Sequence, residues 1–122
     1  MARILIIDDD EAVLSVLKDT LLREGYEITE ASDGVEGLKL FLEEPADLVI
    51  TDIYMPEKEG LELIQDIRAA SSNVRIIAMS GGSPSAPGFP TLTVADRLGA
   101  DYTVEKPFTQ REMLSVVRRA LG

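Results

Sequence analysis

The chain has 122 residues, of which 45% are hydrophobic and 28% charged, and a formal net charge of −10 at pH 7. This length suits one domain with one core, and the composition is that of an ordinary soluble globular protein rather than a disordered one. The acidic charge argues against a nucleic-acid-binding surface, which would carry a basic stripe. Because the chain contains no histidine and no cysteine, it cannot build a histidine-dependent triad, a zinc site with histidine or cysteine ligands, or a disulfide.

No apolar run approaches the ~18 residues that a membrane-spanning helix needs, and the N-terminus lacks the pattern of a signal peptide. We therefore expect a cytoplasmic protein that makes no contact with a membrane.

Short apolar runs alternate with amphipathic segments along the whole chain. The apolar runs predict strands, in order, over Arg3–Ile7, Tyr26–Ala31, Leu48–Thr51, Val74–Met79 and near Tyr102–Val104. Apolar residues at helical spacing predict helices over about Glu11–Glu24, from Gly34 through Leu42, after Gly60, around Leu92–Leu98 and over about Gln110–Leu121. Strands that alternate with helices imply right-handed crossovers, so we expect one α/β domain over residues 1–122, with a doubly wound, five-stranded parallel sheet.

Local signals predict how some of these helices begin, end and pack. Gly25 is expected to end the first helix, and Asp10 to cap its start. Thr109 followed by Glu112 predicts a capping box for the last helix. In the second helix, the residues expected to face inward are Val35, Leu38 and Phe41.

Polar residues follow four of the five predicted strands. Asp8 and Asp9 follow the first strand, Asp52 the third, Ser80 the fourth and Lys106 the fifth. In open α/β sheets, ligands bind outside the carboxyl ends of the strands, so these residues should gather at one edge. Three carboxylates there form a site for a hard divalent cation, which prefers oxygen ligands.

The order of these motifs resembles one known family. The chain carries Asp8-Asp9, then Asp52 with Met55-Pro56 and Gly60 downstream, then Ser80-Gly81, and finally Lys106-Pro107-Phe108. Each motif alone is weak, but the five in sequence, over the whole chain and at nearly the family's spacing, resemble the receiver domain of bacterial two-component response regulators. The chemotaxis receiver has a flavodoxin-like (βα)5 fold with strand order 2-1-3-4-5, so the resemblance implies that order here.

The resemblance also implies a chemistry for the edge of the sheet. Asp52 would be the phosphoacceptor and would form an aspartyl phosphate, while Lys106 and Ser80 would each contact a phosphoryl oxygen. Because the chain has no histidine, the donor would be the phosphohistidine of another protein, a sensor histidine kinase or a histidine phosphotransfer protein, or else a small phosphodonor. The domain would be a signalling domain rather than an enzyme, would assist its own phosphorylation and dephosphorylation, and would switch its binding to a downstream target protein.

The same resemblance implies a Mg²⁺ cofactor. Asp9, Asp52 and the backbone carbonyl of Tyr54 would bind the ion directly, and Asp8 would act through a bound water. A site with few carboxylates and several waters suits Mg²⁺. The ion would neutralise charge on the transferring oxygens.

Three features bear on how this chain would switch. Family members usually carry an aromatic residue three positions before the lysine, but this chain has Thr103 there, with Tyr102 one residue earlier. Neighbouring strand residues face opposite sides, so Tyr102 should not simply replace the missing ring. The loop after Ser80 looks longer than usual and is rich in Pro, Gly and Ser over Ser83–Pro90. The family also has a cis peptide bond before the residue that matches Pro107.

Other interpretations stay open at this point. A haloacid-dehalogenase-like phosphatase also uses an Asp nucleophile, Mg²⁺ and a lysine, but it needs a second Asp two residues after the nucleophile, where this chain has Tyr54. A receiver that cannot be phosphorylated and serves only as an interaction module is a further alternative. The sequence fits both a stand-alone receiver and a piece of a larger regulator, and it does not name the kinase, the target or the oligomeric state.

Overall fold

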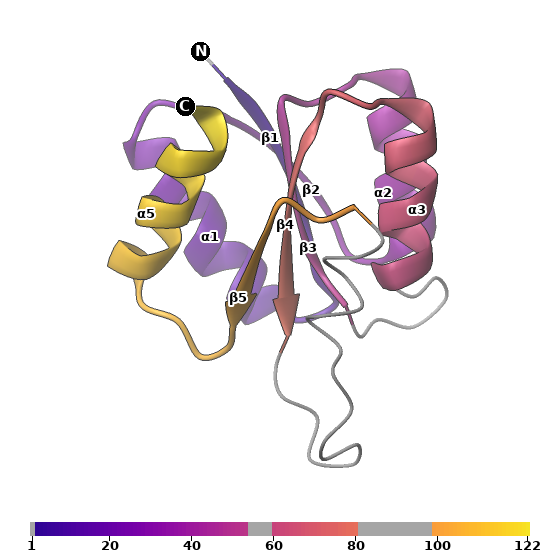
Figure 1. The fold of residues 1–122 in the computed structure, drawn as a ribbon. Helices are drawn as coiled ribbons and strands as arrows, with labels where there is room; N and C mark the ends of the chain where they lie inside the picture. Colours follow the sequence, from indigo (N-terminus) through magenta and orange to yellow (C-terminus); the bar gives the residue numbers. More distant parts are fainter. Residues whose placement is uncertain (1, 54–59, 81–98) are drawn as a thin grey trace.

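The computed structural model describes residues 2–53, 60–80 and 99–122. It contains a five-stranded, fully parallel sheet with strand order β2-β1-β3-β4-β5 (Figure 1). The strands are β1 (Arg3–Ile7), β2 (Glu27–Ala31), β3 (Leu48–Asp52), β4 (Arg75–Ser80) and β5 (Tyr102–Glu105). The predicted fold class and strand order are therefore confirmed.

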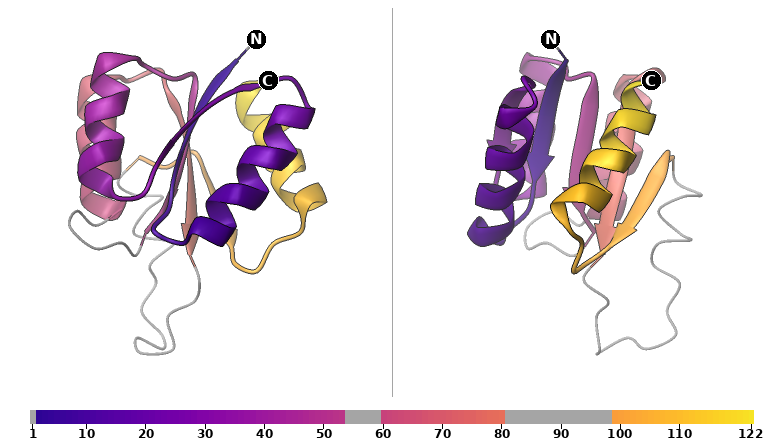
Figure 2. Two further views of the ribbon diagram at one scale, coloured as in Figure 1. Left: turned by 180° about the vertical axis from the view of Figure 1, so that it is seen from behind. Right: turned by 90° about the vertical axis from the view of Figure 1, so that its left-hand side faces the viewer.

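Among the described residues, two helices pack on each face of the sheet, and Figure 2 shows the two layers from further sides. The helices are α1 (Glu11–Arg23) and α5 (Gln110–Leu121) on one face, and α2 (Gly34–Glu43) and α3 (Gly60–Ala70) on the other. The helix predicted around Leu92–Leu98 lies outside the described residues. Within the described parts of the chain, no helix combines the length and the apolar character needed to cross a membrane.

The apolar runs of the strands become two cores because successive strand residues point to opposite faces. Ile4 and Ile6 of β1 pack into the cluster covered by α1 and α5, whereas Leu5 and Ile7 pack into the cluster covered by α2 and α3. All four side chains are at most 2% exposed. A strand that is apolar at every position is thus buried on both sides, as predicted.

The predicted helix ends are confirmed. Asp10 caps α1 by accepting a hydrogen bond from the Ala12 N–H, and Gly25 follows that helix with a left-handed φ of 90°. Thr109 and Glu112 form the reciprocal capping box of α5. These caps satisfy backbone donors that the first turn of a helix leaves without partners.

The expectation that Val35 faces inward is wrong. Its side chain is 57% exposed, whereas Leu38 is partly buried and Phe41 fully buried, as expected. The buried stripe of α2 runs through Gly34, Gly37 and Phe41, and Val35 lies ~100° around the helix from Gly34. Apolar spacing therefore located the helix correctly but assigned one residue too many to its buried face.

Gly60 lies where α3 starts against the end of β3. Its N–H donates a hydrogen bond to the Ile53 carbonyl at 2.8 Å, and a Cβ atom added to it would lie 2.1 Å from the Asp52 carbonyl oxygen. This contact is with backbone, which cannot swing aside as a side chain would. Glycine is therefore required here to bring α3 onto the backbone of Asp52.

We expect Gly60→Ala to lower the free energy of unfolding by about 2 kcal/mol or more, because overpacking against rigid backbone typically costs ~1–3 kcal/mol. The matched control is Gly37→Ala in α2, whose added Cβ would meet only the movable tip of Ile7, at 2.6 Å from Cδ1. There, a helix-propensity gain of up to ~1 kcal/mol opposes the cost of moving that tip. Urea denaturation of both variants tests the contact, and equal effects would contradict it.

Candidate functional site

The carboxyl edge of the sheet collects the polar residues that follow the strands. Asp8 directly follows β1, Asp52 and Ser80 are the last residues of β3 and β4, and Lys106 directly follows β5. The strands are parallel, with Asp52 paired to Met79 and Ser80 paired to Glu105, so their ends lie at the same height. This is the gathering that the sequence predicted.

Three carboxylates form a cluster at this edge. Asp8, Asp9 and Asp52 each offer an oxygen, and these atoms all lie within 4.8 Å of one another. Asp8 is fully buried and Asp52 is 5% exposed, whereas Asp9 is open to solvent. Two of the three charges therefore sit where water screens them poorly.

Lys106 supplies the positive charge beside this cluster. Its Nζ donates to Asp8 Oδ2 at 2.6 Å and lies 3.4 Å from Asp52 Oδ2. Its backbone N–H donates to the Ser80 carbonyl at 2.7 Å, which ties it to the end of β4. The peptide bond between Lys106 and Pro107 is cis, as the family resemblance implied.

Backbone groups orient both buried carboxylates. The Asp10 N–H donates to Asp8 Oδ1 at 2.9 Å, and the Ile53 N–H donates to Asp52 Oδ1 at 2.8 Å. In each side chain, one oxygen is held by the main chain and the other faces Lys106. Residue types carry no signal for such main-chain donors, so sequence reasoning did not find them.

Burial and charge act in opposite directions on the ionisation of this cluster. Burial raises the pKa of Asp8 and outweighs the hydrogen bonds from Lys106 and the Asp10 N–H, which lower it. Burial alone would lower the pKa of Lys106, but its hydrogen bond to Asp8 and the nearby charge of Asp52 outweigh burial and raise it. The two directions are compatible because Lys106 gains from two carboxylates, whereas Asp8 has a single cation and faces the like charge of Asp9.

The arrangement fits a divalent cation. Three carboxylates and one ammonium group leave a formal charge of −2, and unit charges ~4 Å apart repel by ~4 kcal/mol at an effective dielectric constant near 20. The donors are all hard carboxylate oxygens, which suit Mg²⁺ or Mn²⁺. Tyr54, whose backbone carbonyl was predicted as a further ligand, lies outside the described residues, as does the Ser83–Pro90 loop.

Tyr102 and Thr103 face opposite sides of β5, as expected. Tyr102 packs with Val104 into the cluster covered by α1 and α5, and its hydroxyl donates to the Arg119 carbonyl at 3.5 Å. Thr103 is exposed on the other side. The tyrosine ring therefore does not occupy the face on which receivers usually carry their aromatic switch residue.

Comparison with known proteins identifies the family. The sequence profile of the response regulator receiver domain matches residues 4–118, nearly the whole chain. The chain belongs to the response regulator receiver domain family. It is therefore a signalling domain of two-component systems, and this match favours the receiver over the phosphatase-like alternative.

Individual relatives agree with this assignment. The chain is 37% identical to the DNA-binding transcriptional regulator NtrC of Azospirillum brasilense and 33% identical to the transcriptional regulatory protein CpxR of Klebsiella pneumoniae, in each case over 99% of its length. It spans only 24% of that NtrC and 50% of that CpxR. The comparison thus concerns the receiver part of these longer regulators.

Solved structures show the same fold. A CheY-like receiver domain protein from Methanospirillum hungatei superposes with a TM-score of 0.91 at 31% identity, covering 99% of this chain and 94% of that one. A receiver domain protein from Clostridium thermocellum gives a TM-score of 0.89 at 29% identity, with coverage of 99% and 94%. The receiver fold therefore accounts for the whole described sheet and its helices.

The raised pKa of Asp8 predicts a pH-dependent effect on stability. Its folded-state pKa lies above the unfolded value of 3.8, so its contribution to stability is complete below pH 3.8 and is lost as the pH rises through the folded-state pKa. At pH 7 in EDTA, Asp8→Asn should therefore raise the free energy of unfolding of this receiver domain. The difference from wild type should narrow as the pH falls toward 4, which urea melts across this range would measure. A wild type more stable than the variant at pH 7 would show that the Lys106 ion pair outweighs burial.

Proposed function

We propose that Asp52 of this receiver domain accepts a phosphoryl group from the phosphohistidine of a sensor histidine kinase or a histidine phosphotransfer protein. The observation that carries the proposal is the position of the Asp52 carboxylate: its Oδ2 lies 3.4 Å from Lys106 Nζ, and one of its oxygens lies in the cluster formed with Asp8 and Asp9. The Asp52 carboxylate therefore lies beside a cation and within a group of carboxylates that could hold a metal ion. Phosphoryl transfer depends mainly on such positioning and charge stabilisation.

The chemistry divides between the donor and this chain. An oxygen of Asp52 forms a bond to phosphorus, and the nitrogen–phosphorus bond of the phosphohistidine breaks. The electron pair of that bond stays on the imidazole nitrogen, so a phosphohistidine whose other ring nitrogen carries a proton leaves as neutral imidazole and takes no proton from this chain. Lys106 pairs with one phosphoryl oxygen, and the Ser80 hydroxyl donates a hydrogen bond to another. Both groups therefore stabilise the negative charge on the phosphoryl oxygens during the transfer.

Asp8, Asp9 and Asp52, with the Tyr54 carbonyl, would hold Mg²⁺. When bound, the ion neutralises charge on the transferring oxygens. Because the carboxylates, Lys106 and Ser80 all belong to this chain, we propose that the domain assists both its own phosphorylation and its dephosphorylation. A small phosphodonor then needs to supply only the phosphoryl group.

We further propose that residues 1–122 act as one receiver domain whose phosphorylation changes its binding to a downstream protein. Its curated relatives are transcriptional regulators, and NtrC is described as DNA-binding. Any contact with nucleic acid would belong to other parts of such regulators, because the net charge of −10 on this chain opposes binding to a polyanion.

The decisive experiment is incubation with acetyl phosphate and Mg²⁺, followed by intact mass spectrometry. We expect the wild type to gain one phosphoryl group and Asp52→Asn to gain none. The matched control is Asp33→Asn, which makes the same chemical change at the cap of α2, outside the cluster, where asparagine caps almost as well. Phosphorylation of Asp52→Asn at the wild-type level would refute the assignment, and so would a wild type that is never modified.

Metal binding should raise thermal stability, because a ligand specific to the folded state stabilises it by ~2.7 kcal/mol at a concentration of 100 times Kd. We expect millimolar Mg²⁺ or Mn²⁺ to raise the Tm and Asp9→Asn to remove most of that rise. Asp9 is exposed, so its replacement leaves the core intact. Calorimetry with Asp33→Asn as the control would detect a general effect of surface charge, which would move all three proteins equally.

A further inference from the structure

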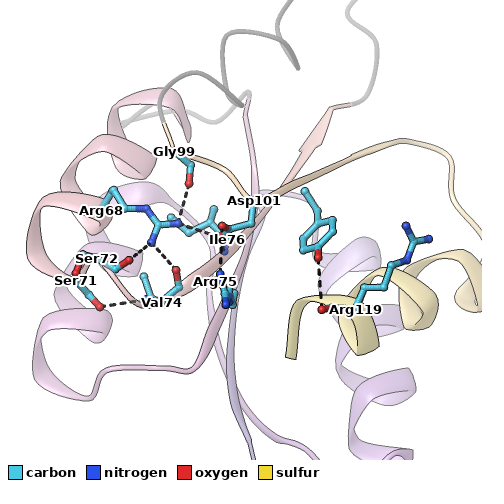
Figure 3. A network of polar contacts seen from close by, with 10 residues as sticks. Arg68, Ser71, Ser72, Val74, Arg75, Ile76, Gly99, Asp101 and Arg119 are labelled. Carbon is cyan, nitrogen blue, oxygen red and sulfur yellow. Dashed lines mark hydrogen bonds and ion pairs between the residues drawn. The ribbon is translucent and has the colours of Figure 1, made fainter. Parts of the chain in front are cut away.

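A second polar network lies at the other end of the sheet, where β4 and β5 begin (Figure 3). Its centre is Arg68, near the end of α3. The Nη1 group donates to the carbonyls of Ser72 at 3.1 Å and Val74 at 2.6 Å, and Nη2 donates to the Gly99 carbonyl at 2.7 Å and to Asp101 Oδ2 at 2.9 Å. One guanidinium group thus joins the end of α3 to the segments that lead into β4 and β5.

Asp101 uses the same carboxylate oxygen to begin the pairing of β5 with β4. Its N–H donates to the Ile76 carbonyl at 2.8 Å, and the Ile76 N–H donates to Asp101 Oδ2 at 2.8 Å. The side chain therefore stands in for a backbone acceptor and adds one reciprocal pair ahead of the ladder, which starts at Ile77 opposite Tyr102. With Arg68 holding that oxygen, the position of β5 along β4 is specified before the strand begins.

This register determines where Lys106 lies. β5 has only four residues, and among the described strands it pairs with β4 alone. Its last residue pairs with Ser80, and the next residue is Lys106. Because a one-residue slip moves every side chain of a strand to the opposite face, a shift of β5 along β4 would carry the ammonium group away from Asp8.

The other end of α3 lies at the carboxylate site. Gly60 begins the helix against the backbone of Asp52 and Ile53, and Arg68 lies in its last turn. α3 therefore runs from Asp52 to Asp101, and β5 runs from Asp101 back to Lys106. Lys106 Nζ in turn lies 3.4 Å from Asp52 Oδ2, so these contacts lead from Asp52 through α3, Asp101 and β5 back to Asp52.

We propose that Arg68 and Asp101 are positioning residues that hold Lys106 at the phosphoryl site by setting the register of β5. The inference rests on the proposed function, because it assigns a structural origin to the placement of the lysine used there. The side chains of Arg68 and Asp101 are 24% and 26% exposed, so each is partly shielded from solvent. Gly99 has a φ of +122°, and an added Cβ would lie 3.2 Å from Arg68 Nε, so the backbone there is shaped to admit the guanidinium.

The test is a double-mutant cycle on the rate of Asp52 phosphorylation by acetyl phosphate with Mg²⁺. We expect Arg68→Ala to slow the reaction about tenfold, since a misplacement of 1 Å can cost ~10²-fold. In a Lys106→Ala background, the same change should have little further effect, because the residue that it positions is gone. A loss of equal size in both backgrounds would indicate a general structural role and would overturn the proposal.

Variants of Arg75 and Asp101 add controls to this cycle. Arg75→Ala removes a guanidinium whose Nη1 lies 3.7 Å from Asp101 Oδ1 but which is 58% exposed and belongs to β4 itself, so it should leave the rate unchanged. Asp101→Asn keeps an oxygen for the Ile76 N–H and should retain more activity than Asp101→Ala. A rate that falls as far in Arg75→Ala as in Arg68→Ala would contradict the specific role of Arg68.

Amide hydrogen exchange gives a readout that does not depend on activity. In Arg68→Ala, exchange of the Lys106 N–H, which donates to the Ser80 carbonyl, should speed up together with β5, while the amides of β1 and β3 stay protected. Unchanged exchange in β5 would overturn the inference by itself.

The phosphorylation rates separate this inference from the proposed function. If Lys106→Ala is phosphorylated at the wild-type rate, the assigned role of Lys106 is wrong, and so is the positioning role that depends on it. If Lys106→Ala is phosphorylated slowly but Arg68→Ala at the wild-type rate, the proposed function stands and the positioning role of Arg68 is refuted.

Discussion

Two buried carboxylates share one ammonium group at the carboxyl edge of the sheet, and this arrangement makes the strongest demands on the rest of the fold. A buried charge is tolerated only when it is paired and hydrogen-bonded. Asp8 and Asp52 meet that condition through Lys106 on one oxygen and a main-chain N–H on the other. The pairing with Lys106 and the main-chain hydrogen bonds both require that the ends of β1, β3 and β5 stay fixed relative to one another. A parallel sheet that is packed on both faces holds these strand ends in place.

The same demand explains why contacts remote from the cluster matter. Gly60 lets α3 start directly on the backbone of Asp52, and Arg68 ties the last turn of that helix to Asp101, the residue that precedes β5. The first contact fixes α3 against the backbone of Asp52, and the second fixes the same helix to the residue before β5, the strand that Lys106 follows. In the register that we assign to Arg68 and Asp101, the lysine is held by the ladder as well as by its ion pairs. A residue on a short edge strand needs such support, because few hydrogen bonds hold the strand itself.

Much of this could be predicted from sequence because its signals are local. Continuous or alternating apolar residues located the strands, and the polar residues that follow four of these strands located the site. The Arg68 network could not be predicted, since it depends on backbone carbonyls of Ser72, Val74 and Gly99 that no residue type announces. Val35 was assigned to the wrong face because hydrophobicity alone does not show that Gly34 and Gly37 take the buried positions. The register of β5, which places Lys106, likewise arises from a side chain acting as a backbone acceptor.

The electrostatics of the cluster relate its stability to its proposed chemistry. The site sets three carboxylates against one ammonium group. Burial raises the pKa of Asp8, which shows that its negative charge is unfavourable there, and the neighbouring carboxylates raise the pKa of Lys106, which favours its charged form. A divalent cation bound to the carboxylates would offset this negative charge. In the reaction that we propose, a phosphoryl group on Asp52 would offer Lys106 new acceptor oxygens in place of the Asp52 carboxylate. Lys106 could then exchange the Asp52 carboxylate for a phosphoryl oxygen while it stays paired with Asp8. The positive charge that the proposed reaction needs is therefore in position before the phosphoryl group is transferred.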